Sequence, residues 1–363
     1  MLDIEETSEV QKNQDMIFNL ITNGEHEQVL FCYDKPTGLK AIIAVHSTVL
    51  GPSLGGTRIW NYQNDQEALV DVLRLSRGMT YKAAISGLNL GGGKAVIIGD
   101  ATKIKSPEFW KRYGQFVESL GGRYITAEDV NTTVGDIEIV ASQTKHVSGL
   151  PLEKGGSGDP SPFTAYGVYL GMKATAKYRW GNDSLGGKKV SVQGVGKVGT
   201  GLIEYLLEEG ATVYATDLFE DRVSSLSKRL NIIPVGSEEI YDVDVDIYAP
   251  CALGATINDN TISRLKCEAV VGAANNQLEV EDKHISLLKD RDILYAPDFL
   301  VNAGGVINCY TELEGYNKEK ALKNTEKIYD ATLEIFSKSN TEGISTLKAA
   351  MEIAENRIAS NRK

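Results

Sequence analysis

Hydrophobic and polar positions alternate along the chain in a way that predicts an α/β protein. Short apolar runs of strand length stand between longer segments whose apolar residues recur every three or four positions, as in a helix with one buried face. In the first half, β-rich runs at 28–33 and 39–50 are joined by a turn with Pro36 and Gly38, which predicts a hairpin. Further strands are predicted at 95–98 and, as a short strand that ends in two acids, within 121–130, and helices at 8–23, 65–82, 107–120 and 133–141.

The second half of the chain repeats this alternation. Strands are predicted at 188–192, 212–216, 245–249, 269–271 and 293–295, and helices at 163–178, 202–209, 318–338 and 344–360. A run rich in glycine, serine and proline at 155–162 separates the two halves. We therefore predict two α/β domains: 1–148, completed by a C-terminal helix at 340–363, and 149–339.

Composition excludes several classes of protein. Of 363 residues, 42% are apolar and 24% are charged, which is typical of a soluble globular protein, and the net charge of −11 argues against nucleic-acid binding. The N-terminus is acidic, and no apolar run approaches the roughly 18 residues of a membrane span. The four cysteines and four histidines lack metal-ligand spacing, so we expect reduced thiols in the cytoplasm and no metal site.

One stretch, 77–94, carries two lysines twelve residues apart. Lys82 ends a helical run, whereas Lys94 follows three glycines and opens the apolar run 95–98. A glycine turn can adopt positive φ and approach a ligand closely, which makes Lys94 a candidate for chemistry; the alternative is a loop lysine beside a flexible turn. The glycines of 51–58 likewise predict a break in the strand whose N–H groups face a ligand carboxylate, or else a plain tight turn.

Two adjacent acids end the strand near residue 128. On a strand, Glu128 and Asp129 point to opposite sides, so only one of them can face a given site. The alternative is that they begin the helix at 133–141.

The strongest motif is G-x-G-x-x-G at Gly194, Gly196 and Gly199. It follows a predicted strand, precedes a helix, and is followed by a second strand that ends in Asp217, 18 residues after Gly199. This context is that of a dinucleotide-binding unit, in which the helix N-terminus binds the pyrophosphate and the acid binds the ribose. An acid at this place would repel a 2′-phosphate, which favours NAD over NADP.

The motifs described above occur along the chain in an order that resembles that of the glutamate, leucine, valine and phenylalanine dehydrogenase family. The motifs that carry the resemblance are 51–58, 77–100, 123–130, 160–167, 194–199, 249–254 and 303–308. The resemblance implies an N-terminal substrate domain, a C-terminal Rossmann NAD-binding domain and a cleft between them. It also implies reversible oxidative deamination of an L-amino acid to a 2-oxo acid and ammonium.

The resemblance also implies roles for single residues. Lys82 matches the lysine that binds the substrate carboxylate, and Lys94 and Asp129 match the catalytic lysine and aspartate. Asn276 matches an asparagine near the substrate amine and the nicotinamide, and Thr164 matches a threonine that binds the nicotinamide amide. Further implied positions are Gly55 and Met79 for the substrate and Lys197, Val198, Ala249, Cys251 and Ala274 for the cofactor.

The chemistry suits these residue types. A lysine acts as a general base only in its neutral form, which a dry site and a second cation such as Lys82 both favour. We expect Lys94 to activate the water that attacks the iminium, and Asp129 to pass protons to and from the amine. NAD accepts the hydride.

Four positions are implied to line the side-chain pocket: Leu54, Ala127, Val306 and Cys309. Glutamate dehydrogenases carry a lysine where this chain has Leu54, and burying a carboxylate against leucine is costly, so glutamate is disfavoured. We expect leucine, isoleucine or valine as substrate. Phenylalanine or tryptophan stays open, because Cys309 is small, 274–277 is similar to the aromatic-type enzymes, and one methylene discriminates by only about 1–3 kcal/mol.

A non-catalytic NAD-binding regulator is the alternative of another class, although it would not need Lys82, Lys94 and Asp129 together. The family is oligomeric and includes octamers. The resemblance therefore implies a homo-oligomer of at least two subunits. The octameric enzymes often continue with a basic tail, whereas this chain stops at Lys363, soon after its last predicted helix, so an octamer is possible but is not what we expect.

Overall fold

A computed structural model describes residues 16–362, and they form two compact units. Unit 1 contains the described residues up to Thr80 together with Asn89–Val147, and unit 2 contains Tyr81–Leu88 and the chain from Ser148 onward. Of the helix predicted at 8–23, the structure describes α2 (Met16–Asn23), and the earlier part lies outside the described residues.

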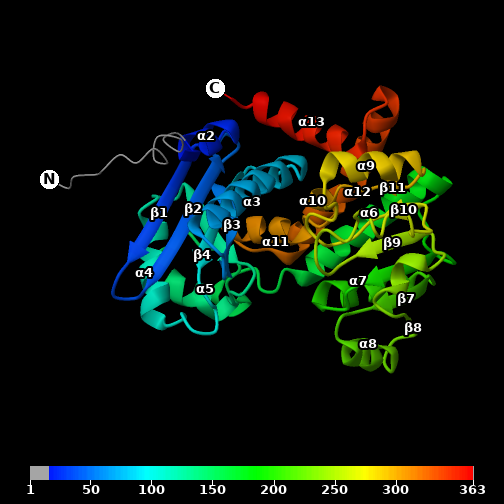
Figure 1. The fold of residues 1–363 in the computed structure, drawn as a ribbon, viewed down its shortest axis with the longest axis horizontal. Coiled ribbons are helices and arrows are strands. Elements are labelled where there is room, and N and C mark those ends of the chain that lie inside the picture. Colours follow the sequence, from blue (N-terminus) through cyan, green and yellow to red (C-terminus); the bar gives the residue numbers. More distant parts are fainter. Residues whose placement is uncertain (1–15, 363) are drawn as a thin grey trace. The chain divides into compact units, whose positions relative to one another are not determined.

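Unit 1 is built on a mixed five-stranded sheet (Figure 1). In sheet order the strands are β1 (Gln28–Asp34), β2 (Leu39–Ser47), β4 (Gly91–Ile98), β3 (Ser53–Trp60) and β5 (Tyr124–Glu128). The β1–β2 pair is the predicted hairpin, and β4 is antiparallel to β2. β3 runs parallel to both β4 and β5, so the carboxyl ends of these three strands lie at one edge of the sheet.

Helices cover both faces of this sheet. The helix α3 (Asp65–Ile85) packs its apolar side on β2 and β4 through residues such as Leu69 and Val72. On the other face, α4 (Pro107–Glu118) is fixed by Tyr113, whose hydroxyl lies 2.5 Å from Thr57 Oγ1 on β3. The short helix α5 (Val134–Ala141) begins at a capping box on Thr133. The predicted acids therefore do not cap it.

Unit 2 contains a six-stranded parallel sheet in the order β11-β10-β9-β6-β7-β8. The strands are β6 (Lys189–Gln193), β7 (Thr212–Thr216), β8 (Ile233–Pro234), β9 (Ile247–Pro250), β10 (Ala269–Val270) and β11 (Leu294–Tyr295). The first strand lies in the middle and the chain then extends the sheet on both sides, which is the Rossmann arrangement. The strand order reverses between β6 and β9, where such sheets bind dinucleotides.

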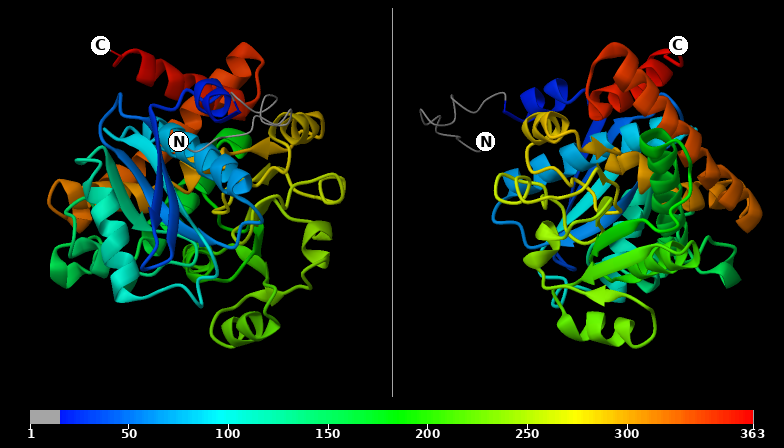
Figure 2. Two further views of the ribbon diagram at one scale, coloured as in Figure 1. Left: turned by 60° about the vertical axis from the view of Figure 1, so that its left-hand side comes forward. Right: turned by 90° about the vertical axis from the view of Figure 1, so that its right-hand side faces the viewer.

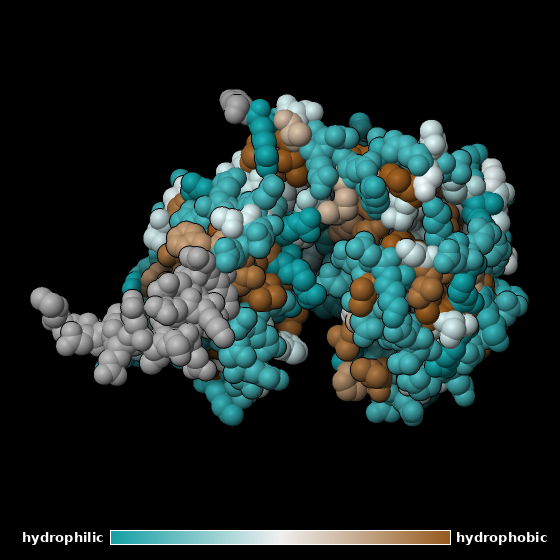
Figure 3. Space-filling view, turned by 45° about the horizontal axis from the view of Figure 1, so that its top comes forward, coloured by the Kyte–Doolittle hydropathy of each residue, from teal (hydrophilic) through white to brown (hydrophobic). Residues whose placement is uncertain are grey.

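The helices of unit 2 pack on this sheet and on one another (Figures 1 and 2). They are α6 (Ser161–Trp180), α7 (Lys197–Glu208), α8 (Glu220–Ser227), α9 (Glu281–Asp290), α10 (Asp298–Val301), α11 (Gly304–Leu313), α12 (Lys318–Glu342) and α13 (Thr346–Ala359), with 3₁₀ turns at Leu152–Lys154 and Glu239–Asp242. Of these, α11 packs on α6 and α12, and α13 packs on α12. Across the described residues, none of the helices is both long and apolar enough to span a membrane. The face drawn in Figure 3 is mostly hydrophilic, with apolar residues in small groups.

The C-terminal helix α13 contacts the end of α3. The guanidinium of Arg357 donates to the carbonyl oxygens of Ala83, Ala84 and Leu88, at 3.3, 3.0 and 2.7 Å. These contacts place 81–88 in unit 2 together with α13. The predicted domain limits, with 340–363 assigned to the first domain, stay a prediction.

Candidate active site

One face of the unit 1 sheet collects the residues predicted for chemistry and for the substrate. In the strand register Gly56 pairs with Ala127, and Leu54 pairs with Gly92, two residues before Lys94. Paired residues, and residues two apart on a strand, share a face. Leu54, Lys94 and Ala127 therefore lie on the face that α3 covers. Leu54 and Ala127 are buried there, 3% and 7% exposed.

Lys94 and Asp129 form an ion pair on this face. Nζ of Lys94 lies 2.6 Å from Oδ2 of Asp129, and the lysine is only 6% exposed. Burial alone raises the pKa of the Asp129 carboxyl, but the charges of Lys94 and Arg58 outweigh burial and hold that pKa below its usual value. A buried cation and a carboxylate in direct contact are the groups that proton transfer requires.

The glycines before Lys94 do not form a turn, and that prediction is wrong. Gly91, Gly92 and Gly93 are the first three residues of β4, and none has positive φ. A Cβ on Gly92 would lie 2.1 Å from the backbone nitrogen of Thr80 and 2.5 Å from the carbonyl oxygen of Ser76, both on α3. Gly92 is thus needed because a helix, rather than a ligand, approaches the strand closely, and Gly91 and Gly93 are needed because Ser47 and Tyr124 occupy the space of a Cβ.

Of the glycines of 51–58, Gly51 lies in the predicted break, a turn between β2 and β3 where its φ is positive, whereas Gly55 and Gly56 belong to a strand. Gly55 and Gly56 lie within β3, between β4 and β5. A Cβ on Gly55 would lie 1.7 Å from the carbonyl oxygen of Gly93, and one on Gly56 would lie 2.7 Å from Cβ of Asp129. Gly56 therefore leaves the space that Asp129 occupies.

Arg58 is a site residue that sequence reasoning did not assign. Its Nε lies 3.3 Å from Oδ2 of Asp129, and its NH1 lies 3.2 Å from Oδ2 of Asp71 on α3. Tyr62 donates its hydroxyl to the same Asp71 oxygen at 2.6 Å. The sequence offered only an arginine at the end of the glycine run 51–58; the burial of its neighbours Thr57 and Ile59, which marks it as unusual, is visible only in the structure.

The predicted carboxylate-binding lysine, Lys82, lies on the last turn of α3, within the segment that belongs to unit 2. Its Nζ lies 3.3 Å from Oδ1 of Asn275, which also accepts from Asn302 Nδ2 at 2.8 Å. Met79, three residues earlier, is half-buried in unit 1.

Asn276 has φ of +52°, a left-handed conformation that is unusual for a residue other than glycine. Its carbonyl accepts from Ala255 N–H at 2.7 Å, and its own N–H and that of Gln277 donate to the buried carboxyl of Asp298. The surrounding backbone thus fixes the conformation of the predicted substrate- and nicotinamide-contacting residue.

The glycine motif has the geometry that a dinucleotide requires. Gly194 has φ of +106°, and a Cβ on Gly199 would lie 1.9 Å from the carbonyl oxygen of Gly194, so both positions need glycine for the turn and for packing. A Cβ on Gly196 would meet nothing within 4 Å. Gly196 is also the N-cap of α7, whose first residues are Lys197 and the half-buried Val198. The cradle therefore fits a pyrophosphate at a helix N-terminus.

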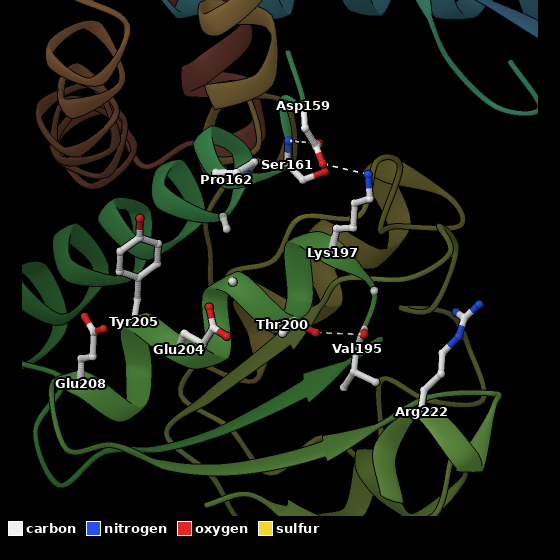
Figure 4. A pocket seen from close by; sticks show the side chains of 13 residues that line it. Asp159, Ser161, Pro162, Val195, Lys197, Thr200, Glu204, Tyr205, Glu208 and Arg222 are labelled. Atoms are coloured by element: carbon white, nitrogen blue, oxygen red, sulfur yellow. Dashed lines mark hydrogen bonds and ion pairs between the residues drawn. The ribbon is translucent and has the colours of Figure 1, made fainter. Parts of the chain in front are cut away.

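A cavity of about 720 Å³ opens at this loop, between the first turns of α6, the exposed side of α7 and Arg222 of α8 (Figure 4). Lys197 spans its edge with an ion pair of 2.8 Å to Asp159. Next to the loop, Asp217 follows β7 as predicted; its Oδ2 accepts from Val195 N–H at 2.9 Å and its Oδ1 from Phe219 N–H at 3.0 Å.

The other predicted cofactor residues lie at the carboxyl ends of β9 and β10 and at the start of α6. Ala249 is on β9, and Cys251 follows it, with its N–H bonded to Gln193 at the end of β6. Ala274 donates its N–H to the carbonyl of Pro250. Thr164 is half-buried in the first turn of α6, against Gly305 at the start of α11. Residues 16–362 contain no group of three or more His, Cys, Asp or Glu placed to hold a metal ion.

The remaining two pocket positions, Val306 and Cys309, lie one turn apart on α11 in unit 2. Glu312, on the same helix, binds the segment 148–157 at the start of unit 2. One oxygen of this carboxylate accepts from Gly149 N–H at 2.8 Å and from Ser157 N–H and hydroxyl at 2.9 and 2.7 Å. The assembly of all four pocket positions into one site stays a prediction.

Comparison with known proteins gives matches over nearly the whole chain. Two family models match: "Glu/Leu/Phe/Val dehydrogenase, dimerisation domain" at residues 26–146, and "Glutamate/Leucine/Phenylalanine/Valine dehydrogenase" at 155–218 and 219–363. The chain is 52% identical to leucine dehydrogenase of Bacillus cereus over 344 residues, which are 95% of this chain and 94% of that protein.

Relatives with aromatic substrates in their names are also similar. Phenylalanine dehydrogenase of Caldalkalibacillus thermarum is 49% identical over 339 residues, which cover 92% of this chain and 91% of that protein. The crystal structure of L-tryptophan dehydrogenase from Nostoc punctiforme is 44% identical, with a TM-score of 0.84, and the match covers 95% of this chain and 99% of that one.

Proposed function

Because the chain belongs to the glutamate, leucine, phenylalanine and valine dehydrogenase family, we propose that it catalyses NAD-dependent oxidative deamination of a branched-chain L-amino acid. An L-amino acid, NAD⁺ and water give the 2-oxo acid, ammonium, NADH and a proton, and the reaction is reversible. The observation that carries the proposal is the Lys94–Asp129 ion pair of 2.6 Å, on the sheet face that also holds Leu54 and Ala127.

We assign separate tasks to the three charged residues. Lys82 binds the α-carboxylate that all amino acids share. Lys94, in its neutral form, activates the water that attacks the iminium and donates to the carbinolamine oxygen. Asp129 takes the proton of the substrate ammonium before hydride transfer and returns it to the leaving amine.

The cofactor, when bound, supplies the hydride acceptor, and the protein positions it. Gly194, Gly196 and Gly199 hold its pyrophosphate at the N-terminus of α7. Asp217 hydrogen-bonds the ribose hydroxyls, and its charge supports NAD over NADP. Thr164 and Asn276 hold the nicotinamide.

The branched-chain preference rests on the apolar residues at the pocket positions. Leu54 is 3% exposed on the face of Lys94, so a substrate carboxylate placed against it would lose water without gaining a cation. This argues against glutamate and for an aliphatic side chain of medium size.

An aromatic amino acid is the second candidate. The observation in its favour is Asn275, whose side chain accepts from the predicted carboxylate-binding Lys82 at 3.3 Å. The family resemblance associates an uncharged residue here with aromatic-type enzymes, and the likeness to the tryptophan and phenylalanine enzymes agrees with it.

A panel of L-amino acids tests the proposal. NADH absorbance is followed after mixing the protein with NAD⁺, or with NADP⁺, and each amino acid at alkaline pH. We expect kcat/KM to be highest for leucine, isoleucine or valine with NAD⁺. Higher kcat/KM for phenylalanine or tryptophan would replace the branched-chain proposal by the aromatic one, and no NADH with any L-amino acid would refute the activity.

Lys94→Ala tests the assignment of the base. Loss of a positioned proton-transfer group lowers kcat by about 10²–10⁴-fold. NADH binding, measured by fluorescence, should be unchanged, because the predicted cofactor residues lie in unit 2 and Lys94 lies in unit 1. A variant with near wild-type kcat would show that Lys94 is not the base.

We further propose a cytoplasmic homo-oligomer of at least two subunits. The model that matches residues 26–146 describes a dimerisation domain, which supports assembly through unit 1. Light scattering on the purified chain measures the mass; a monomer at micromolar concentration would refute the assembly.

A further inference from the structure

The carboxylate of Asp129 has two cationic neighbours, and the mechanism above uses only one. Nε of Arg58 lies 3.3 Å from Oδ2 of Asp129, the oxygen that Nζ of Lys94 approaches to 2.6 Å. Among residues 16–362, these two cations are the ones within ion-pair distance of this carboxylate. We propose, as an extension of the proposed function, that Arg58 is a positioning residue that holds Asp129 ionised and in place while Lys94 changes its charge.

Arg58 is itself held from the far side. Its NH1 lies 3.2 Å from Oδ2 of Asp71, so the planar guanidinium joins a carboxylate of α3 to the one that follows β5. Tyr62 donates to the same Asp71 oxygen, and burial raises the pKa of its phenol, which therefore stays neutral. Asp71 and Tyr62 thus leave the guanidinium few alternative orientations.

The backbone also limits the movement of Asp129. Its N–H donates to Thr132 Oγ1 at 2.7 Å, and its Cβ lies against Gly56. The Arg58 contact adds a constraint at the carboxylate itself. With backbone and side chain both fixed, Asp129 Oδ2 keeps its position toward Lys94 even when the lysine contact weakens.

The charges explain why an arginine suits this place. A lysine that accepts a proton from water must first be neutral, and a neutral amine no longer attracts a carboxylate as an ion. Arginine stays protonated at any pH at which the protein is folded. Arg58 therefore keeps a full positive charge beside Asp129 through the whole cycle, and Asp129 can accept the substrate proton in each turnover.

The other titratable groups around Asp129 do not replace Arg58. Tyr124 on β5 lies on the opposite face of the sheet, where its hydroxyl donates to the carbonyl oxygen of Gly55 at 2.6 Å, and burial raises the pKa of its phenol to about 12, so it is uncharged. Arg74 approaches Asp71 at 3.7 Å from the exposed side of α3, where its side chain is 67% exposed, and it contacts Asp71 rather than Asp129. Arg74 is thus a matched control: a cation on the same Asp71 without the Asp129 contact.

The test compares Arg58→Met, Arg58→Lys and Arg74→Met in the full-length chain. For Arg58→Met, we expect kcat for the best amino acid to fall about 10- to 100-fold, since one charge-assisted hydrogen bond is lost. The acid limb of its kcat–pH profile should move to higher pH, because Asp129 next to fewer positive charges ionises less readily. The KM for NAD⁺ should stay at the wild-type value.

Arg58→Lys keeps the charge but cannot bridge both carboxylates. We expect its kcat to fall about 5- to 20-fold with an acid limb near that of the wild type. Arg74→Met should match the wild type in both readouts. This pattern separates the effect of the charge from that of the bridge.

Several kinetic outcomes would overturn the inference. The first is a wild-type kcat and pH profile in Arg58→Met. If Arg58→Met does not fold, the second is a wild-type kcat in Arg58→Lys. The third is a loss of kcat in Arg74→Met as large as that in the Arg58 variants. Melting temperature and NADH affinity show whether each variant is folded; a kcat loss that only follows a loss of folded protein also overturns it. A wild-type chain that oxidises no L-amino acid would instead refute the proposed function.

Discussion

The carboxylate of Asp217 accepts a hydrogen bond of 2.9 Å from the backbone N–H of Val195, which fixes the end of β7 to the glycine loop. The residue predicted to bind the cofactor ribose therefore also shapes the loop that is predicted to bind the pyrophosphate. Its other oxygen accepts from Phe219 N–H, and its side chain is only 9% exposed. We therefore expect affinity for the cofactor to depend on Asp217 in two ways.

Asp217→Asn should weaken cofactor binding without changing the chemical step. The amide has one acceptor oxygen, so its NH₂ group must face either Val195 N–H or Phe219 N–H, and the loop loses a hydrogen bond. We expect the KM for NAD⁺ to rise about 10- to 100-fold and kcat to stay within about twofold. Steady-state kinetics measures both, with the exposed Asp221→Asn on α8 as the control. A lower kcat at unchanged KM would contradict this reasoning.

Glycine substitutions on two adjoining elements should have opposite effects. A Cβ on Gly92 would lie 2.1 Å from the Thr80 nitrogen, whereas one on Gly78, in the exposed interior of α3, would meet nothing within 4 Å. We expect Gly92→Ala to lower the free energy of unfolding by about 1–3 kcal/mol or more. Gly78→Ala should raise it by about 0.5–1 kcal/mol, because alanine favours the helix.

Urea unfolding followed by circular dichroism measures both glycine variants. A Gly92→Ala protein as stable as the wild type would mean that β4 and α3 can separate at no cost. A destabilised Gly78→Ala would mean that this position is in contact with other groups.

Glu312→Ala should loosen α11 from the segment that opens unit 2. The variant leaves the N–H groups of Gly149 and Ser157 and the Ser157 hydroxyl without their acceptor. Leaving buried donors unpaired costs about 1–3 kcal/mol each, with partial compensation by water. We expect a lower melting temperature and faster amide hydrogen exchange at 148–157, with exposed Glu319→Ala as the control. Unchanged exchange in that segment would rule out the role of Glu312.

The Lys94–Asp129 pair should make stability depend on pH on the acid side. Burial raises the pKa of Asp129, but the charges of Lys94 and Arg58 lower it by more than burial raises it. The pKa of Asp129 is therefore lower in the folded state than in the unfolded state. The ionised carboxylate therefore stabilises the folded protein above the unfolded pKa, near 4, and this contribution is lost as the pH falls through the folded-state pKa.

Asp129→Asn tests this dependence. We expect its free energy of unfolding to be about 1–3 kcal/mol below that of the wild type between pH 5 and 7, with the difference shrinking toward pH 3. Urea unfolding at each pH measures it. A difference that grows on acidification would reverse the assigned direction of the pKa shift.

The sequence predicted β6, β7 and the helix between them because that motif is local, although it did not predict α8, α9 or α11. Gly194 to Asp217 lies within one strand–helix–strand unit, so its spacing alone reflects the fold. The glycines of unit 1 were misread for the opposite reason. Gly92 is constrained by Ser76 and Thr80, on an element 12 to 16 residues away along the chain, and no local pattern distinguishes such packing from a turn.

Arg58 shows the same limit for the site. Arg58 ends the family motif at 51–58, but its proposed role depends on Asp71 and Asp129, which lie 13 and 71 positions further along the chain. The sequence singled out Lys94 and the acids at 128 and 129, but their roles came from the resemblance. The Lys94–Asp129 contact of 2.6 Å follows from the parallel register of β3 with β4 and β5, which spacing does not reveal.

The three glycines that open β4 also bear on how such an enzyme can change. Each has backbone or buried side-chain atoms where a Cβ would stand, so the segment that presents Lys94 tolerates almost no variation. The four predicted pocket positions lie on other elements, and the backbone there does not require one particular residue. They are Leu54 on β3, Ala127 on β5, and Val306 and Cys309 on α11. If the proposed roles hold, the reaction and the substrate selectivity depend on different segments of the chain. We therefore expect that directed evolution can change the accepted amino acid while the segment that leads into Lys94 is kept unchanged.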